Sequence, residues 1–292
     1  MEKEKILKAG KIASQVREYA KSIIKKDDFL FEIAEKIEAK ILELGGKPAF
    51  PVNLSINDIA AHYTPSYDDK NTAIGLLKID IGVHVDGFIA DTAFSIDLEN
   101  SQENKKIIEA SEKALENALK KIKKDSVISE IGNQIEKTIT SNGLNPIINL
   151  SGHEMKPYDL HSGLTIPNFD NKKSDKIQNG LYAIEPFSTN GNGKVYDGKP
   201  SGIYNLINNK NPRSQFAREL LEFIEEEYQT LPFCSRWLVK KFGTKALFGL
   251  KQLEDNGNLH HFSQLIENSH SKVSQAEHTI LINDNEVIVT TR

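Results

Sequence analysis

The residues that suggest chemistry are acidic and histidine side chains set among apolar ones, and the clearest pair is Asp80 with Asp91. Both lie in LLKIDIGVHVDGFIADTAFSIDL, residues 76–98. Two β-rich runs there flank Asp86-Gly87, a pair of residues that favours a tight hairpin turn. The pattern therefore predicts an antiparallel hairpin that carries one aspartate on each strand.

A hairpin that turns at Asp86-Gly87 places Gly82 opposite Asp91 and Asp80 opposite Ala93. Side chains alternate along a strand, so the two aspartates share one sheet face as diagonal neighbours, about 5–8 Å apart. Two ionised carboxylates this close repel, and a shared proton or a cation must relieve the repulsion. A pair of divalent metal ions does this well. Taken alone, the pair is also compatible with aspartates that point into solvent.

Three further residues could join such a site. His153 lies in SGHE, Glu185 in YAIEPF and Glu277 in QAEHT, each in or beside an apolar stretch. A buried carboxylate needs a partner, because removing its charge from water costs several kcal/mol. One imidazole with four carboxylates suits a pair of Mn, Fe, Co or Zn ions. Each of the three is individually also compatible with a surface position or a hydrogen-bonded place in the core.

Two amphipathic helices are expected before the hairpin. Apolar residues recur at helical spacing over residues 5–25. A second stripe ends at Leu44, with Asp27 or Asp28 as the expected N-cap and Gly45-Gly46 as the expected stop. Residues 47–75 contain three prolines and are expected to form loops.

The rest of the chain alternates between helix and strand signals. Helices are expected over about 105–124 and 126–142, followed by strands and loops over 147–190. Residues 213–255 have helical patterns and no strand signal. The tail from His278 returns to strand, with a turn near Asn283-Asp284-Asn285. A strand-containing body interrupted by a helical insertion is the organisation that this predicts.

Composition bounds the function class. The chain has 292 residues, is 38% hydrophobic and has a formal net charge of -4, enough for one large domain or two smaller ones. A polyanion-binding protein is usually basic, so nucleic acid is not the favoured partner. The single cysteine excludes an internal disulfide, the amino terminus lacks a secretory layout, and no apolar run reaches the roughly 20 residues of a membrane span. A cytoplasmic protein is expected.

Six segments, in this order, resemble the type 2 methionine aminopeptidases in their short archaeal form: FPVNLSINDIAAHYTP, LKIDIGVHVDGFIADTAFSI, NLSGHEM, LHSG, AIEPFSTNG and SQAEHTILI. The resemblance implies an α/β (α+β) pita-bread fold of the creatinase/aminopeptidase kind. It also implies that residues 1–192 and 263–292 form the catalytic domain. Residues 193–262 would form an inserted helical, winged-helix-like subdomain that distinguishes type 2 from type 1.

The family's metal-ligand pattern carries over to five positions, and two divalent ions (Co, Mn, Fe or Zn) are implied as cofactors. Asp91 and Glu277 would bridge both ions. Asp80 would bind mainly one ion, and His153 and Glu185 would bind the other.

The resemblance also assigns residues around the substrate. His62 in AAHYTP and His161 in LHSG match catalytic histidines, and Glu185 is expected to act as a proton shuttle besides binding metal. The walls of a methionine pocket are expected at Phe50, Leu160 and Phe187.

The implied reaction removes the initiator methionine from nascent proteins and peptides, preferentially when the second residue is small. A metal-bridging hydroxide would attack the first peptide carbonyl. The partners would be nascent polypeptide amino termini, met at the ribosome, and the protein would be a monomer that needs neither a specific nucleic acid nor a membrane.

Two alternatives share much of this pattern. A proline-specific aminopeptidase or prolidase would carry the same five ligands, although such enzymes usually have a separate amino-terminal domain. A non-enzymatic binding protein on the same fold would have lost metal ligands, whereas all five positions here keep ligand chemistry.

Overall fold

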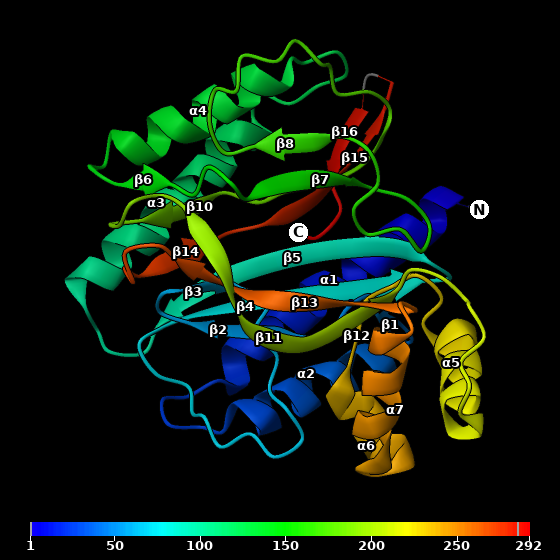
Figure 1. Cartoon of the computed structure of the whole chain (residues 1–292). Coiled ribbons are helices and arrows are strands. Elements are labelled where there is room, and N and C mark those ends of the chain that lie inside the picture. The colour runs from blue at the N-terminus through cyan, green and yellow to red at the C-terminus, as the bar shows by residue number, and fades with distance from the viewer. Residues whose placement is uncertain (1, 285) are drawn as a thin grey trace.

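The computed structural model describes residues 2–284 and 286–292, and its helices and antiparallel sheets form three groups (Figure 1). In two of these groups a pair of helices covers one or two antiparallel sheets, and the sheets of the two groups meet along their inner edges. The third group contains the remaining helices, which lie at the lower right of this view, and two long strands that cross its middle. Each group has its own cluster of buried apolar side chains.

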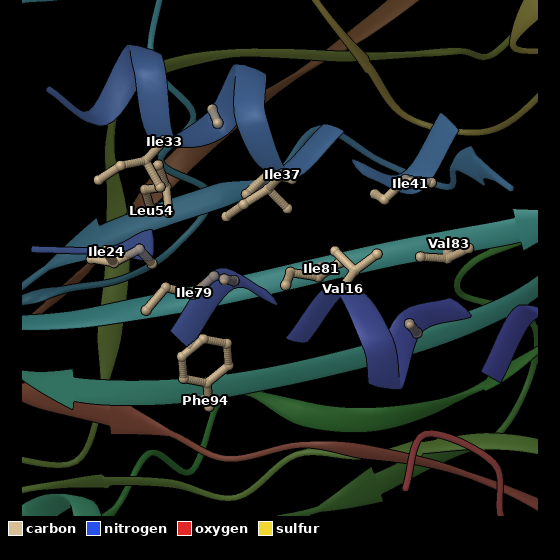
Figure 2. Packing of buried hydrophobic residues seen from close by; sticks show 14 of the residues in the cluster. Val16, Ile24, Ile33, Ile37, Ile41, Leu54, Ile79, Ile81, Val83 and Phe94 are labelled. Atoms are coloured by element: carbon tan, nitrogen blue, oxygen red, sulfur yellow. The ribbon is translucent and has the colours of Figure 1, made fainter. Parts of the chain in front are cut away.

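In the first group two helices pack on a four-stranded antiparallel sheet. Ile33, Ile37 and Ile41 of one helix and Val16 of the other lie against the inner strands of the sheet (Figure 2), as the periodic stripes predict. The elements are α1 (Glu2–Ile23), α2 (Leu30–Glu43), β1 (Lys47–Pro48), β2 (Asn53–Ile56), β4 (Leu76–Val85) and β5 (Phe88–Asp97).

The ends of α2 test two of the sequence expectations. Gly45 adopts φ +80 and its backbone N–H donates to Leu42, so the helix stops where the glycines predict. The expected N-cap is wrong. The residue at that position is Phe29, whose side chain has no acceptor and makes no capping bond. The carboxylate of Asp28 accepts instead from the N–H of Lys25, in the turn after α1.

The hairpin of β4 and β5 has the predicted register. Gly82 pairs with Asp91 and Asp80 with Ala93. Asp86 and Gly87 have φ values of 49 and 85, as a type I′ turn requires. The two strands are long and almost fully buried because helices cover one face and the rest of the molecule covers the other.

The second group repeats this plan with two helices over two antiparallel sheets. The helices are α3 (Gln102–Leu119), which begins and ends a few residues before its predicted range, and α4 (Ile128–Thr140), which lies within its own. One sheet has the order β16 (Glu286–Val289), β15 (His278–Asn283), β9 (Gly180–Ile184), β7 (Ser151–Met155) and β8 (Thr165–Pro167), and the other has β14 (Val273–Gln275), β10 (Phe187–Thr189) and β6 (Asn145–Pro146). The predicted terminal turn joins β15 to β16, and Asn285 within it lies outside the described residues.

Hydrogen bonds join the two groups where β5 lies against β14 and β15. The N–H of Glu277 donates to the carbonyl of Ala93 at 2.9 Å, and the N–H of Asp91 donates to Thr279 Oγ1 at 2.7 Å. Thr92 Oγ1 donates to the carbonyl of Glu277 at 2.9 Å. These bonds fix Asp91 and Glu277, which are 186 residues apart in sequence (277 − 91), beside each other.

The third group spans residues 195–267 and is less helical than the pattern of residues 213–255 predicts. Its helices bury Leu220, Ile224, Leu238 and Leu250 with other apolar residues of the same segment. Two long strands enclose the helices, and a short strand at Phe233–Cys234 lies inside the stretch that had no strand signal, so that part of the prediction is wrong. The elements are β11 (Val195–Leu206), α5 (Gln215–Glu227), β12 (Phe233–Cys234), α6 (Ser235–Phe242), α7 (Lys245–Asp255) and β13 (Leu259–Glu267).

The stretch 47–75 also contains strands that the loop prediction missed, since β1 and β2 both pair with β4 and β3 (Ile59–Ala61) pairs with β13. Short strands between prolines carry too few residues to show an alternating pattern. Among the described residues, no helix combines the length and the apolar character that a membrane crossing requires.

Candidate functional site

One cavity lies where the three groups meet, and every residue that the sequence singled out for chemistry lines it. The two sheets form its floor, and β11 and β13 with the chain before β12 form a side wall. The predicted residues on its surface are Phe50, His62, Asp80, Asp91, His153, Leu160, His161, Glu185, Phe187 and Glu277.

The β4–β5 hairpin supplies the two aspartates from one face, as its register requires. Gly82 stands between them on that face, and the ring of Phe50 lies directly over it. A Cβ built on Gly82 would come within 2.3 Å of the Phe50 ring. Glycine at this position therefore lets an aromatic wall approach the carboxylates closely.

The second group supplies the other three residues from neighbouring strands. His153 in β7 pairs with Ala183 in β9, and Ile184 in β9 pairs with His278 in β15. Glu185 and Glu277 each lie one residue beyond that last pair, so they leave their strands at the same end. Sheet register thus brings a histidine and two glutamates to one edge, facing the hairpin.

Ligand atoms of Asp91, His153 and Glu277 lie within 4.8 Å of one another. His153 Nε2 lies 3.7 Å from Asp91 Oδ2 and 3.6 Å from Glu185 Oε1. Asp80 lines the cavity beside this group. All five side chains that the ligand pattern names are therefore concentrated at one end of the cavity.

Burial and mutual repulsion both act on these carboxyl groups. Burial raises the pKa of Asp80 to about 7. Burial, followed by the nearby carboxylates of Asp80 and Glu185, raises the pKa of Asp91 well above its usual value. Burial and then neighbouring carboxylates likewise raise the pKa values of Glu185 and Glu277. Four acids held together without a compensating cation are costly to ionise.

The donor atoms fit a divalent metal site. Among the described residues, Asp80 Oδ1 and Asp91 Oδ1 are buried without a hydrogen-bond partner. Native proteins rarely leave buried polar atoms unsatisfied without a functional reason. Carboxylate oxygens with one imidazole are a donor set that Mn, Fe, Co and Zn accept. The orphaned oxygens, the cluster and the raised pKa values all point to bound cations.

The two further histidines lie beside this end of the cavity. The rings of His161 and His153 meet edge to face with centroids 4.4 Å apart. His62 Nδ1 lies 3.2 Å from the carbonyl of Ser263, and its backbone has φ +63, an uncommon value for a residue other than glycine. Burial, and then His161, lowers the pKa of His62 to about 4, and burial lowers that of His161. Both rings are therefore neutral at pH 7.

Several residues of the cavity were not found by sequence reasoning. Gln275 Nε2 lies 3.3 Å from Glu277 Oε2 and 3.4 Å from Glu185 Oε2, and its position two residues before Glu277 is the local signal that could have pointed to it. Asn53 pairs with Asp80, and its Oδ1 is buried without a partner among the described residues. The side wall formed by Ile203, Pro232 and Phe262 carries no local signal.

Comparisons with known proteins agree with this geometry. The sequence pattern of metallopeptidase family M24 matches residues 4–283. The methionine aminopeptidase of Pyrococcus abyssi is 45% identical over 100% of both chains. That of Methanocaldococcus jannaschii is 45% identical over 99% of this chain and 98% of its own.

A solved structure of a thermophilic Arx1 has a TM-score of 0.83 to this chain, covering 98% of this chain and 89% of its own, at 16% identity. Identity that low shows a shared fold and no more. The α/β pita-bread architecture expected from the sequence is the fold observed. With a family pattern that spans almost its whole length and relatives at 45% identity, the chain belongs to metallopeptidase family M24.

Proposed function

We propose that this chain is a type 2 methionine aminopeptidase that uses two divalent metal ions. The hydrolase activity itself, removal of an amino-terminal methionine, is that of its relatives at 45% identity over the whole chain. The observation that carries the proposal is the cavity, where five potential ligands lie at one end beside apolar walls of Phe50, Leu160 and Phe187.

Five residues would hold the metal ions, namely Asp80, Asp91, His153, Glu185 and Glu277. Bound there, divalent ions lower the pKa of water and so provide a nucleophile near neutral pH. The choice among Co, Mn, Fe and Zn depends on availability as much as on affinity, because an oxygen-rich set with one imidazole suits them all.

The remaining chemistry would come from side chains of the chain itself. A methionine side chain would lie against Phe50, Leu160 and Phe187, with the carbonyl of the first peptide bond toward His161. A neutral His161 can donate one hydrogen bond to the oxygen as negative charge develops on it. His62 would contact the scissile amide nitrogen, and Glu185 would carry a proton to the leaving amine.

Residues 193–262 support the type 2 assignment, because they carry a separate apolar cluster and enclose three helices between β11 and β13. We propose them as the inserted winged-helix-like subdomain, with 1–192 and 263–292 as the catalytic domain. The substrates would be amino termini of nascent polypeptides with a small second residue, met at the ribosome by a monomeric enzyme.

Methionine release from a Met-Ala-Ser peptide tests the proposal. Protein stripped with a chelator would be resupplied separately with Mn, Fe, Co or Zn, and metal bound per chain would be counted. We expect release from the free-amine peptide alone, two ions per chain at full activity, and no cleavage of an amino-blocked peptide. Cleavage of a proline dipeptide in preference to Met-Ala-Ser, or folded protein inactive with every metal, would contradict it.

A further inference from the structure

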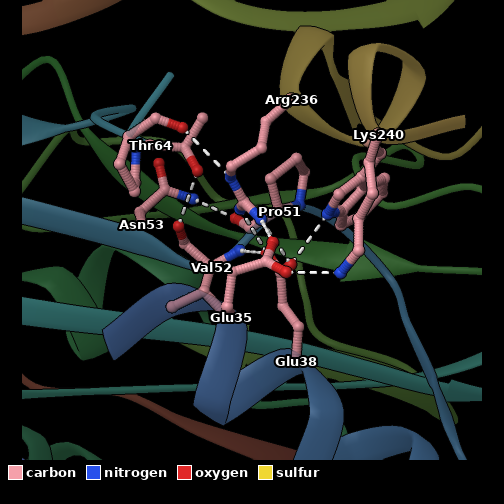
Figure 3. A network of polar contacts seen from close by, with 10 residues as sticks. Glu35, Glu38, Pro51, Val52, Asn53, Thr64, Arg236 and Lys240 are labelled. Carbon is pink, nitrogen blue, oxygen red and sulfur yellow. Dashed lines mark hydrogen bonds and ion pairs between the residues drawn. The ribbon is translucent and has the colours of Figure 1, made fainter. Parts of the chain in front are cut away.

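A buried ion pair lies apart from the ligand cluster and joins two groups of the molecule (Figure 3). Arg236, at the start of α6, and Glu38, in α2, are 2% and 6% exposed. Arg236 Nη1 donates to Glu38 Oε2 at 2.8 Å and Nη2 donates to Oε1 at 2.7 Å. This forked geometry fixes the orientation of both side chains as well as their separation.

Both members of the pair also bind backbone or ring atoms around them. Glu38 Oε1 accepts from the N–H of Val52 at 3.2 Å, and Oε2 accepts from Trp237 Nε1 at 2.8 Å. Arg236 Nε donates to the carbonyl of Pro65 at 3.1 Å. The pair therefore holds two backbone segments, one at Val52 and one at Pro65.

These two segments carry residues of the cavity. Phe50 lies two residues before Val52, and His62 lies three before Pro65. Thr64 Oγ1 donates to the carbonyl of Val52 at 2.9 Å, which ties the segments to each other. The uncommon backbone conformation of His62 needs such support, because a strained residue persists only where its surroundings determine it.

Arg236 is connected to the side wall of the same cavity as well. It lies two residues after Cys234, the last residue of β12. Cys234 pairs with Ile203, and Ile203 and Pro232 both line the cavity. One guanidinium thus links the insertion wall to the segments that carry Phe50 and His62. Neither Arg236 nor Glu38 lines the cavity itself.

Stability alone gives little reason for charged residues here, since a well-packed apolar pair is often as stable as a buried ion pair. We infer that Arg236 and Glu38 are positioning residues that set the enzyme's preference for methionine, by fixing Phe50 and His62 against the wall that the insertion supplies. The inference rests on the proposed function, because it takes this cavity as the methionine pocket.

The test replaces both charges at once, with Glu38→Leu and Arg236→Met in one protein. This double variant leaves no buried charge unpaired and is expected to fold. Its KM for Met-Ala-Ser should rise with kcat within about twofold of the wild type, as lost positioning of the bound side chain requires. Discrimination between Met-Ala-Ser and Leu-Ala-Ser should fall about tenfold, a change of the size that one methylene group makes in an apolar pocket.

Two controls make the result specific. Lys240→Met removes an exposed ion pair of the same network, with Glu35, and should change neither KM nor discrimination. Arg236→Lys keeps the charge but loses the forked pair of hydrogen bonds, so its KM and its discrimination should lie between those of the wild type and of the double variant. It is the decisive variant if the double variant does not fold. Emission of Trp237, the one tryptophan of the chain, reports whether the network has been broken.

Calorimetric titration with free methionine and free leucine separates this inference from the proposed function. Wild-type protein that fails to release methionine with any metal would refute the proposed function. The role of Arg236 and Glu38 would be overturned by a different result. In that result the double variant and Arg236→Lys both fold and change the emission of Trp237, yet keep the wild-type KM, the wild-type discrimination and the wild-type affinity for methionine over leucine. The proposed reaction would then still stand.

Discussion

In the part of the chain that the structure describes, the buried carboxylate of Glu38 and the carboxylates of the cavity are satisfied in opposite ways. Glu38 accepts four hydrogen bonds from groups that are all part of the chain. In the cavity, Asp80, Asp91, Glu185 and Glu277 face one another, and oxygens of the two aspartates have no partner among the described residues.

The difference separates a structural use of buried charge from a functional one. A carboxylate whose acceptor sites are filled by the protein fixes a geometry. A group of carboxylates whose sites are left open repels itself, and that unfavourable arrangement is retained because a cation completes it. Removing a charge should therefore have opposite effects on stability in the two places.

The largest effect on activity is expected at the carboxylates of the cavity. Glu185→Gln removes one ligand charge and the proposed proton shuttle, so turnover of Met-Ala-Ser should fall by more than the roughly 100-fold loss typical of one acid–base group. The chelator-stripped variant should be at least as stable as the wild type, because one repelling charge is gone. Steady-state kinetics at verified metal content and thermal unfolding measure the two quantities. Near-normal turnover with metal bound would remove the shuttle role.

Glu38→Gln tests the carboxylate whose acceptor sites the chain itself fills. The substitution leaves the guanidinium of Arg236 buried with only Glu35 as a charged partner, so unfolding free energy should fall by about 3–5 kcal/mol. Urea denaturation of chelator-stripped protein measures this. Equal stability of the variant and the wild type would mean that the hydrogen-bonded carboxylate of Glu38 does not differ in this respect from the carboxylates of the cavity.

Gly82→Ala tests the contact between the strand that carries Asp80 and the ring of Phe50 in the pocket wall. The added Cβ would overlap the Phe50 ring, and overpacking of this kind costs about 1–3 kcal/mol. We expect a raised KM for Met-Ala-Ser with metal binding retained, because the ring shifts while both aspartates stay in register. An unchanged KM would show that Phe50 does not form a wall of the methionine pocket.

His84 provides a buried titratable group outside both clusters. Its Nδ1 accepts from the N–H of Gly87, and the charged groups of Lys47, Asp86 and Glu227 surround it. Burial, and then Lys47, lowers its pKa to about 4. The unfolded chain therefore binds the extra proton first, and stability falls as pH drops from 6.5 toward 4.

His84→Asn keeps an acceptor near the Nδ1 position and does not titrate. The loss of unfolding free energy between pH 7 and pH 5 should be smaller in the variant by at most about 2 kcal/mol. Urea midpoints at the two pH values provide the measurement, and parallel losses in both proteins would refute the assignment.

The sequence was most informative where local rules determine position. The Asp86-Gly87 turn determines the register of the hairpin, and the register determines that Asp80 and Asp91 share a face. The helical stripes of α1 to α4 were recognisable because each buries one face only. The His153, Glu185 and Glu277 positions came instead from resemblance to a family, since nothing local brings them together.

The remainder depended on contacts between distant residues. Arg236 and Glu38 are 198 positions apart (236 − 38), and neither shows in its own segment what it will meet. The strand β11 was missed because exposed, half-buried and buried residues follow one another irregularly along it and its pairing with β13 shifts register twice, so no alternation develops. Phe262 and Ile203 reach the cavity only through that irregular pairing.

The order of the ligands along the chain has a consequence for biosynthesis. Asp80 is made early, whereas Glu277 follows 197 residues later (277 − 80), and the two lie together only after β15 has added to the sheet beside β5. Such distant pairing is slow to form. A polypeptide whose synthesis stops before Glu277 exposes an incomplete, self-repelling set of acids, so peptidase activity itself becomes a check that translation and folding have both been completed.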